Sequence, residues 1–309
     1  MKRMITLAIC LTALMSVFAT SPENVAFSVS ADKQVVFSSG NLQYHPANDE
    51  WRFAENQYDY IGAANGNIAA DYDGWVDSFS WSTDNPAAPW GVKAGYSKTD
   101  YQGNFVDWGA NAIGTDAVNT WYTLTANEWQ YVFTDRANAS SLLGVACVNG
   151  YNGLILLPDA WLCPEGITFK SGFHTNYGSA QFAEHQSFSA EEWAVLEEAG
   201  AVFLPAAGYR VDKKMSFVGM NGYYWSASGM STDYASYFDI TAKQVKKNAQ
   251  FRYFGSSVRL VKTYVPTTSA LPNVDTQAIE ANSQKLFRNG QLLIIHNGKT
   301  YNANGTLMQ

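Results

Sequence analysis

The chain has 309 residues, of which 15% are aromatic and only 15% are charged, a balance typical of β-rich extracellular proteins rather than cytosolic enzymes. This length supplies a sizeable core for one large domain or two modest ones. The net charge of −7 argues against nucleic acid as a partner and against electrostatic docking on anionic membranes, since both require a basic surface.

Residues 1–19 have the pattern of a secretory signal peptide. Lys2 and Arg3 precede an apolar run, and Val17 and Ala19 occupy the small-residue positions of a cleavage site. The apolar run is shorter than the roughly 20 residues of a membrane span, and no later run approaches that length. The sequence therefore predicts a protein without a transmembrane segment that is cleaved near Ala19 and is secreted or held at the outer cell surface.

Residues 25–264 have the sequence pattern of one β-rich domain. Short apolar and aromatic runs alternate with Gly, Asn and Asp at intervals of about 8–12 residues, which predicts many short strands joined by turns. Asn-Gly pairs mark turns because both residue types tolerate positive φ. These pairs stand at 65–66, 149–150, 152–153 and 221–222. The stretch 63–114 lacks regular periodicity, so we expect a long loop region that is functional or wraps over the core.

Two segments, 124–136 and 188–200, carry helix signals. Each begins with the spacing of a capping box and continues with an apolar stripe whose Trp we expect in the core. In 124–136 the box residues are Thr125 and Glu128, and the stripe contains Trp129, Val132 and Phe133. In 188–200 the box residues are Ser189 and Glu192, and the stripe contains Trp193 and Leu196. Gly200 is a natural helix stop. The sequence thus predicts an α+β domain of antiparallel sheets with two short helices and long loops.

Cys147 and Cys163 are the cysteines that remain after removal of the signal peptide. They flank a predicted hairpin, and in an oxidising compartment they are a candidate disulfide. A bridge across so short a loop would add about 3 kcal/mol. The alternative is a pair of small buried thiols.

Catalytic and metal-binding patterns are weak. The four histidines, His45, His174, His185 and His296, lack the spacing of a zinc site. The sequence has no nucleophile elbow, phosphate loop or dinucleotide fingerprint. The loop 71–79 contains three Asp but lacks the complete set of oxygen ligands, at the required spacing, of a calcium-binding loop. Incidental calcium binding at this loop remains an alternative. We therefore predict a non-enzymatic protein with no cofactor and no bound metal.

The stretch 221–240 combines aromatic residues with Ser, Thr and Asp, which are residue types that suit a binding surface. Strand alternation predicts one inward face and leaves Tyr237 and Asp239 more exposed. The inward set is Tyr234, Ser236, Phe238 and Ile240. Cross-strand packing explains the aromatic residues equally well, whereas the polar loop 226–233 is the part that we expect to contact a ligand.

The order of motifs along the chain resembles a family of exported Bacteroidetes proteins. The segments that carry the resemblance are 33-KQVVFSSGNLQYHPANDEWRFAENQYDYIG-62, 121-WYTLTANEWQYVFTDR-136, 148-VNGYNGLILLPDAW-161, 203-FLPAAGYR-210, 223-YYWSAS-228 and 257-SVRLV-261. That family resembles the major paralogous domain of Fibrobacter and, more distantly, the formylglycine-generating enzyme superfamily. The resemblance covers roughly residues 27–262 and implies a C-type-lectin-like fold: two helices flank a twisted antiparallel sheet, and late loops and strands make a ligand surface.

The resemblance also implies which residues bind the ligand. The candidates are Trp225, Ser228, Asp233, Tyr234, Tyr237, Arg252 and Tyr253. The calcium-dependent sugar motifs of true C-type lectins and the late cysteine pair of formylglycine-generating enzymes are absent from the sequence. Neither calcium-dependent sugar binding nor oxidase activity is therefore carried over, and the implied partner is a protein or glycan ligand at the cell surface.

The composition changes after residue 264. Residues 265–284 contain two Pro and several Ser and Thr, as in a linker. Residues 285–309 predict a β tail that is too small to fold alone. Within it, 287-FRNGQLLIIHNGKTYNANGTL-307 resembles the sorting signals of the type IX system, which implies the export machinery as a partner. The tail departs from those signals by ending in Met-Gln without a basic residue.

The leading hypothesis is an exported or cell-surface ligand-recognition and adhesion protein. One alternative is a surface glycoside hydrolase, in which Asp159 would act with Asp73 or Asp77 across a cleft. Another is a structural component of the cell surface whose aromatic residues only pack. Low exposure of Trp225 and Tyr237 would favour this last alternative.

Overall fold

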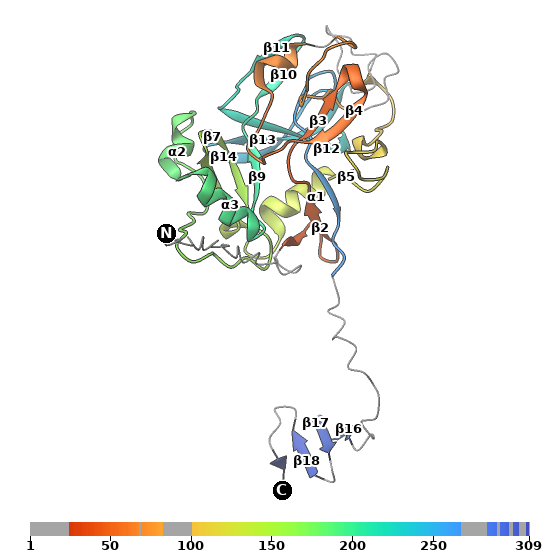
Figure 1. Cartoon of the computed structure of the whole chain (residues 1–309), viewed down its shortest axis with the longest axis vertical. Coiled ribbons are helices and arrows are strands. Elements are labelled where there is room, and N and C mark those ends of the chain that lie inside the picture. Colours follow the sequence, from red (N-terminus) through yellow and green to blue (C-terminus); the bar gives the residue numbers. More distant parts are fainter. Residues whose placement is uncertain are drawn as a thin grey trace, which may run out of the picture. The chain divides into compact units, whose positions relative to one another are not determined.

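The computed structural model describes residues 25–67, 69–82, 101–266, 283–288, 291–296, 299–302 and 307–308. The predicted signal peptide lies outside these residues, as do parts of the long loop region, the linker and the tail. The chain divides into two units, Met1–Pro266 and Thr267–Gln309 (Figure 1). Within the described ranges, no helix combines the length and apolar character needed to cross a membrane.

The first unit consists mainly of antiparallel sheets. One has the order β8-β6-β7-β9 and contains β6 (Leu143–Val148), β7 (Tyr151–Leu156), β8 (Ser187–Phe188) and β9 (Val202–Pro205), with β8 parallel to β6. A second has the order β1-β2-β15-β5 and contains β1 (Phe27–Ser28), β2 (Gln34–Phe37), β5 (Tyr122–Thr123) and β15 (Leu260–Thr263). A third consists of β12 (Asn221–Gly229), β13 (Tyr234–Thr241) and β14 (Gln244–Phe251).

Two hairpins and several single turns complete this unit. The hairpins join β3 (Leu42–His45) to β4 (Glu50–Phe53) and β10 (Tyr209–Val211) to β11 (Lys214–Ser216). The 3₁₀ turns are Pro46–Asn48, Gly62–Gly66, Trp108–Ala110 and Ala139–Ser141. Together with the sheets they make the mostly antiparallel α+β architecture that the sequence predicts.

Both predicted helices are present. Helix α1 (Ala126–Gln130) begins at the Thr125–Glu128 capping box and continues into a π-helical turn, Tyr131–Asp135. Helix α3 (Ala190–Glu198) begins at the Ser189–Glu192 box, and Gly200 follows it with a φ of 97°. A third helix, α2 (Ala180–His185), has no side-chain cap and was not predicted from the sequence.

The Asn-Gly pairs do not all form turns. Asn149 and Gly150 join β6 to β7 with φ values of 46° and 84°, as a tight hairpin requires. Asn152-Gly153 and Asn221-Gly222 instead lie within β7 and β12. Gly153 is needed for close strand packing, since a Cβ there would lie 2.5 Å from the carbonyl oxygen of Leu204 on β9.

Side chains cover both faces of the sheet β12–β13–β14. On one face, Tyr224 and Phe238 pack with Trp129 of α1 in one buried cluster. On the other face, Tyr223, Trp225 and Tyr237 belong to a second cluster, together with Phe79, Trp81 and Trp108. A third cluster lies around Trp193 of α3 and Phe203 of β9. The late strands are therefore central to the core of this unit.

The second unit is a small antiparallel sheet with the order β16-β17-β18-β19. Its strands are β16 (Ser283–Arg288), β17 (Gln291–His296), β18 (Lys299–Asn302) and β19 (Leu307–Met308). Strand β16 begins at Ser283, inside the segment predicted to be a linker.

Candidate functional site

Most of the ligand-binding candidates predicted from the sequence are buried. The exposed fraction is 0% for Trp225 and 7% for Tyr237, and Arg252 and Tyr253 are also buried. Ser228 and Asp233 are half-buried, and Tyr234 is exposed to 36%. The expectation that Tyr237 faces solvent while Tyr234 faces inward is therefore wrong, although Ser236, Phe238 and Ile240 are buried as predicted.

The hydrogen bonds of these residues are structural. The indole Nε1 of Trp225 donates to the carbonyl oxygen of Phe79 over 2.7 Å. The Ser228 hydroxyl accepts from the backbone N–H of Ala126 over 3.0 Å and so satisfies a donor at the start of α1. These side chains hold loops and a helix against the sheet, which leaves them unavailable as a ligand surface.

Arg252 fixes the loop between β12 and β13. Its guanidinium donates to the carbonyl oxygens of Ser231 over 2.6 Å and of Tyr234 over 3.4 Å. It also donates to the carbonyl oxygens of Tyr101 over 3.1 Å and of Gly103 over 3.0 Å. The same group lies 4.3 Å from the ring centroid of Trp81, and burial lowers the pKa of Arg252. Arg252 thus positions the neighbouring surface residue Tyr234.

A row of half-buried and exposed aromatic rings lies beside these buried supports. We define the aromatic row as Phe217, Tyr209, Phe254, Phe251 and Tyr234. Consecutive ring centroids in this order are 6.0, 5.6, 5.8 and 4.3 Å apart. Phe217 is exposed to 44% and has a φ of 57°, which is strained for a bulky residue. The row is a continuous aromatic surface built from β10, β13, the end of β14 and the segments that follow β11 and β14.

A polar patch adjoins the aromatic row through Tyr209. The ring of Tyr209 lies 4.8 Å from that of Tyr223, which is directly opposite Asp239 in the sheet. The Asp239 carboxylate accepts from Asn221 Nδ2 over 2.9 Å, and Asn221 Oδ1 accepts from the Tyr177 hydroxyl over 2.7 Å. Burial raises the pKa of Asp239. Tyr177 is exposed, so one side of this patch reaches solvent.

The edge strand β14 completes the polar patch. Lys246 is directly opposite Asp239, and Asn248 is directly opposite Tyr237. Lys246 and Asn248 are both exposed. We define the polar patch as Tyr177, Asn221, Tyr223, Tyr237, Asp239, Lys246 and Asn248.

The candidate disulfide is not formed, because Cys147 and Cys163 are free thiols. Cys147 lies opposite Asn152, close to the hairpin turn, whereas Cys163 follows the far end of β7, which is Leu156. The Cys163 thiol is exposed and lies 3.4 Å from the carbonyl oxygen of Ile167.

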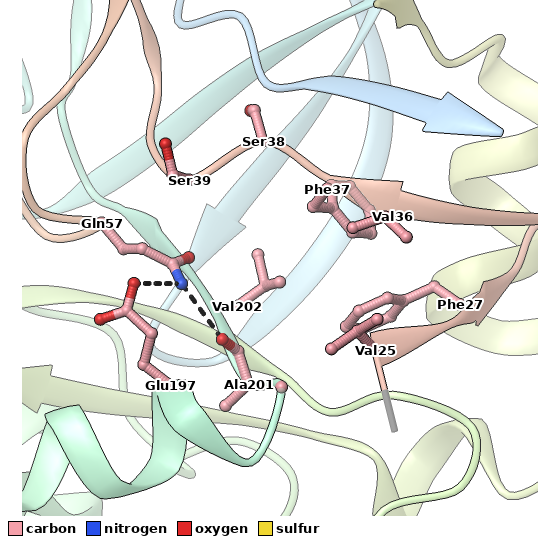
Figure 2. Close-up of a pocket in the computed structure, with 11 residues that line it drawn as sticks. Val25, Phe27, Val36, Phe37, Ser38, Ser39, Gln57, Glu197, Ala201 and Val202 are labelled. Carbon is pink, nitrogen blue, oxygen red and sulfur yellow. Dashed lines mark hydrogen bonds between the residues drawn. The ribbon is translucent and has the colours of Figure 1, made fainter. Parts of the chain in front are cut away.

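A small pocket of about 120 Å³ lies beside β2 and the end of α3 (Figure 2). Its most prominent polar residue is Gln57, whose Nε2 donates to Glu197 and to the carbonyl oxygen of Ala201 over 2.9 and 3.1 Å. Gln57 Oε1 accepts from the backbone N–H of Phe203 and from the buried Arg259. The amide is thus fully used within the protein and offers nothing further to a ligand.

A larger pocket of about 360 Å³ lies beside the π-helical turn. Its apolar lining is Phe133, Leu143, Phe173 and Val245, and Thr134, Ser140, Gly172 and Gln244 complete it. No charged side chain lines it, so the pocket offers an apolar surface without a group that would select a particular ligand.

The carboxylates considered for hydrolysis have separate structural partners. Asp159 accepts from Ser28 and Gln34 and pairs with Arg136 over 3.1 Å. Asp73 has a side chain exposed to 91% and lies 3.4 Å from His45. Among the described residues, no group of three or more His, Cys, Asp or Glu side chains is arranged to hold a metal ion.

Asp77 is the buried carboxylate of this region. It accepts from the backbone N–H of Ile61 over 2.8 Å and from Asn65 Nδ2 over 2.6 Å. Burial raises the pKa of Asp77 to about 6, against the opposing effect of these donors. The side chain ties the loop 61–67 to the segment that leads into the second buried cluster.

We expect Asp77 to make stability depend on pH. Because its pKa is higher in the folded state, the folded protein binds more protons between about pH 4 and pH 6, and stability falls as pH rises through that window. A shift from 3.8 to about 6 corresponds to about 3 kcal/mol. Urea unfolding at several pH values should show this slope, and Asp77→Asn should reduce it. An equal slope in the variant would contradict the assignment.

Several residues of the surface were missed by sequence reasoning. Tyr177, Tyr209 and Phe217 join it only through tertiary contacts, whereas Phe254 lies in the segment 250–254 that the sequence predicts to be an aromatic surface. Strand alternation alone predicts the partial exposure of Asp239. Comparison of the chain with protein-family models, curated proteins and solved structures gave no significant match.

Proposed function

We propose that the protein is a non-enzymatic, exported recognition and adhesion protein that binds its ligand through the aromatic row. The single observation that carries this proposal is the unbroken chain of ring contacts from Phe217 to Tyr234, with both end rings more than one-third exposed. Exposed aromatic rings give large contact area at low entropic cost and are enriched at binding sites.

The fold that we propose is C-type-lectin-like. Support comes from the antiparallel sheets, the two capped helices and the position of the accessible aromatic rings on late strands and loops. The signal-like segment 1–19 and the tail 285–309 support export to the cell surface, with the tail as the proposed contact for the export machinery.

A structural surface component is the second candidate. The burial of Trp225 and Tyr237 favours it, because those side chains only pack. The exposure of Phe217 and Tyr234 favours recognition instead. Full burial of an apolar ring is favourable by about 1.5–3 kcal/mol, and a bound ligand would recover part of this free energy.

Binding of the labelled full chain to a panel of bacterial and epithelial cells would test the proposal. We expect saturable binding that Phe254→Ala and Tyr234→Ala each weaken about tenfold, since an aromatic contact contributes about 1–2 kcal/mol. Leu162→Ala is the matched control, because Leu162 is an exposed apolar residue outside the row. Unchanged binding by the double variant would refute the site, and absence of saturable binding to any cell would favour the structural component.

A further inference from the structure

We infer that the outer edge of β14 binds an extended, acidic peptide segment of a partner protein. The backbone of the peptide pairs with the strand, and one apolar side chain of the peptide fills the larger pocket beside the π-helical turn. This inference goes beyond the proposed function, because it concerns residues 245–249 rather than the aromatic row. We call these residues the β14 edge.

Strand β14 is the last strand of its sheet. The order β12-β13-β14 leaves its outer side without a neighbouring strand among the described residues. On β13, the carbonyl oxygen of Ser236 accepts from the Ser226 hydroxyl of β12, so the backbone groups of Ser236 point toward β12. Ala249 lies opposite Ser236, and backbone groups alternate in direction along an antiparallel pair. Val245, Lys247 and Ala249 therefore direct their backbone N–H and C=O groups away from β13.

These outward groups are available for a further strand. Within the described ranges, the outward backbone groups of Val245 and Lys247 have no hydrogen-bond partner. The N–H of Ala249 donates to Oδ1 of Asn248 over 3.0 Å, and this local contact marks the far end of the edge. Each free residue offers one donor and one acceptor, and an extended peptide carries the complementary set.

The larger pocket, of about 360 Å³, lies at the other end of the β14 edge. Val245 lines this pocket and packs, together with Phe173, against the first buried cluster. A peptide residue paired with Val245 would place its side chain on the same face of the sheet, because directly opposed residues share a face. An apolar side chain at that position would therefore lie over the pocket, whose lining has no charged group.

The charge of the edge determines which peptide fits. Lys243, Lys246 and Lys247 are exposed and form no ion pair with another described residue. They make a local positive region on a chain whose net charge is −7. Lysines on an edge strand repel a second copy of the same edge, which disfavours self-pairing. The same charges attract Asp and Glu side chains beside the apolar residue of a peptide.

Selection of phage-displayed random dodecapeptides on the full chain, followed by synthesis of the enriched sequences, would test the inference. We expect peptides in which one large apolar residue lies next to two or more Asp or Glu. Combined Lys246→Glu and Lys247→Glu should weaken their binding about tenfold or more, because attraction becomes repulsion. Lys213→Glu is the matched control, since Lys213 is an exposed lysine in the turn between β10 and β11 and should leave binding unchanged.

Comparison of Lys247→Pro with Lys247→Ala would test the backbone pairing itself. Both variants remove the charge, but only proline also removes the outward N–H. Proline is tolerated on an edge strand where this N–H faces solvent, so the β13–β14 ladder should persist. We expect Lys247→Pro to bind the synthetic peptides about fivefold more weakly than Lys247→Ala, as for loss of one hydrogen bond. If Lys247→Pro does not fold, peptides with alternate amides N-methylated test the same bonds on the original chain and should bind more weakly by a similar factor.

The outcomes that would overturn the inference are distinct. Enrichment of no peptide, or of basic peptides, would overturn the partner class. Equal binding of methylated and unmethylated peptides would overturn strand pairing. Dimers of the chain that Lys247→Ala stabilises would make a second copy the occupant. None of these results depends on Phe254, so the cell-binding assay judges the proposed function separately.

Discussion

Replacing Arg252 with Met is expected to lower the free energy of unfolding by about 3–5 kcal/mol, because it removes several hydrogen bonds from a charged group that contribute about 1.5–3 kcal/mol each. The substitution removes the guanidinium donors to the carbonyl oxygens of Ser231, Tyr101 and Gly103, of which Tyr101 is the buried residue. Arg252→Lys should lose nearly as much, because one ammonium cannot reproduce the fork of donors.

Urea unfolding followed by tryptophan fluorescence would measure this loss, since all ten tryptophans lie between Trp51 and Trp225, within the first unit. Arg52→Met is the matched control. Arg52 also lies over an indole, with 3.7 Å between its guanidinium carbon and the ring centroid of Trp75, but it donates to the side-chain oxygen of Gln43 rather than to backbone carbonyl oxygens. Its loss should cost below about 1 kcal/mol. Equal stability of Arg252→Met and the original chain would contradict the role given to Arg252.

Trp225→Ala is expected to lower the free energy of unfolding by about 3–5 kcal/mol, the range for removal of a buried Trp. Trp225 has an exposed fraction of 0%, its Nε1 donates to Phe79, and its ring lies 6.2 Å from that of Tyr237. Trp225→Phe should cost less, since a ring remains, but it still removes one of the two donors to the Phe79 carbonyl oxygen, which keeps the backbone N–H of Ser256.

Far-UV circular dichroism during urea unfolding would measure both Trp225 variants. Met230→Ala, in the exposed loop that follows β12, is the control and should stay within about 0.5 kcal/mol of the original chain. Loss of ligand binding in Trp225→Ala without loss of stability would mean that the side chain contacts ligand directly, in conflict with its burial.

The elements that sequence patterns predicted correctly are those whose signals are local. The capping boxes of α1 and α3 join residues three positions apart, and the Asn149-Gly150 turn needs only its own φ values. Helix α2 was missed because Ser179 makes no side-chain cap bond and the helix is held by packing of Phe182 in the core. The sequence wrongly predicted a turn at Gly153. A glycine is needed there because a Cβ would clash with the backbone of Leu204 on β9, about fifty residues later in the chain.

Alternation along β13 shows which side chains share a face, but it cannot show what covers that face. Tyr237 shares a face with Trp225 through the β12–β13 register, as the pattern indicates. That face is covered by Phe79, Trp81 and Trp108, which come from the long loop region more than a hundred residues earlier. The same fact turned Trp225 and Tyr237 from expected ligand contacts into core residues, and Tyr253, outside that cluster, is buried as well.

The sequence by itself determined the β-rich composition, the two helix starts, the hairpin turn at 149–150 and the concentration of aromatic residues in the late strands, because these depend on residue type and on neighbours within one turn or one strand. Only the tertiary structure decided which aromatic rings reach solvent and where the cysteines lie. It also decided that Tyr209, Phe217 and Phe254 join Tyr234 in one surface beside Asp239. Exposure is a property of the packed molecule, since a ring is buried or accessible according to the segments that fold over it.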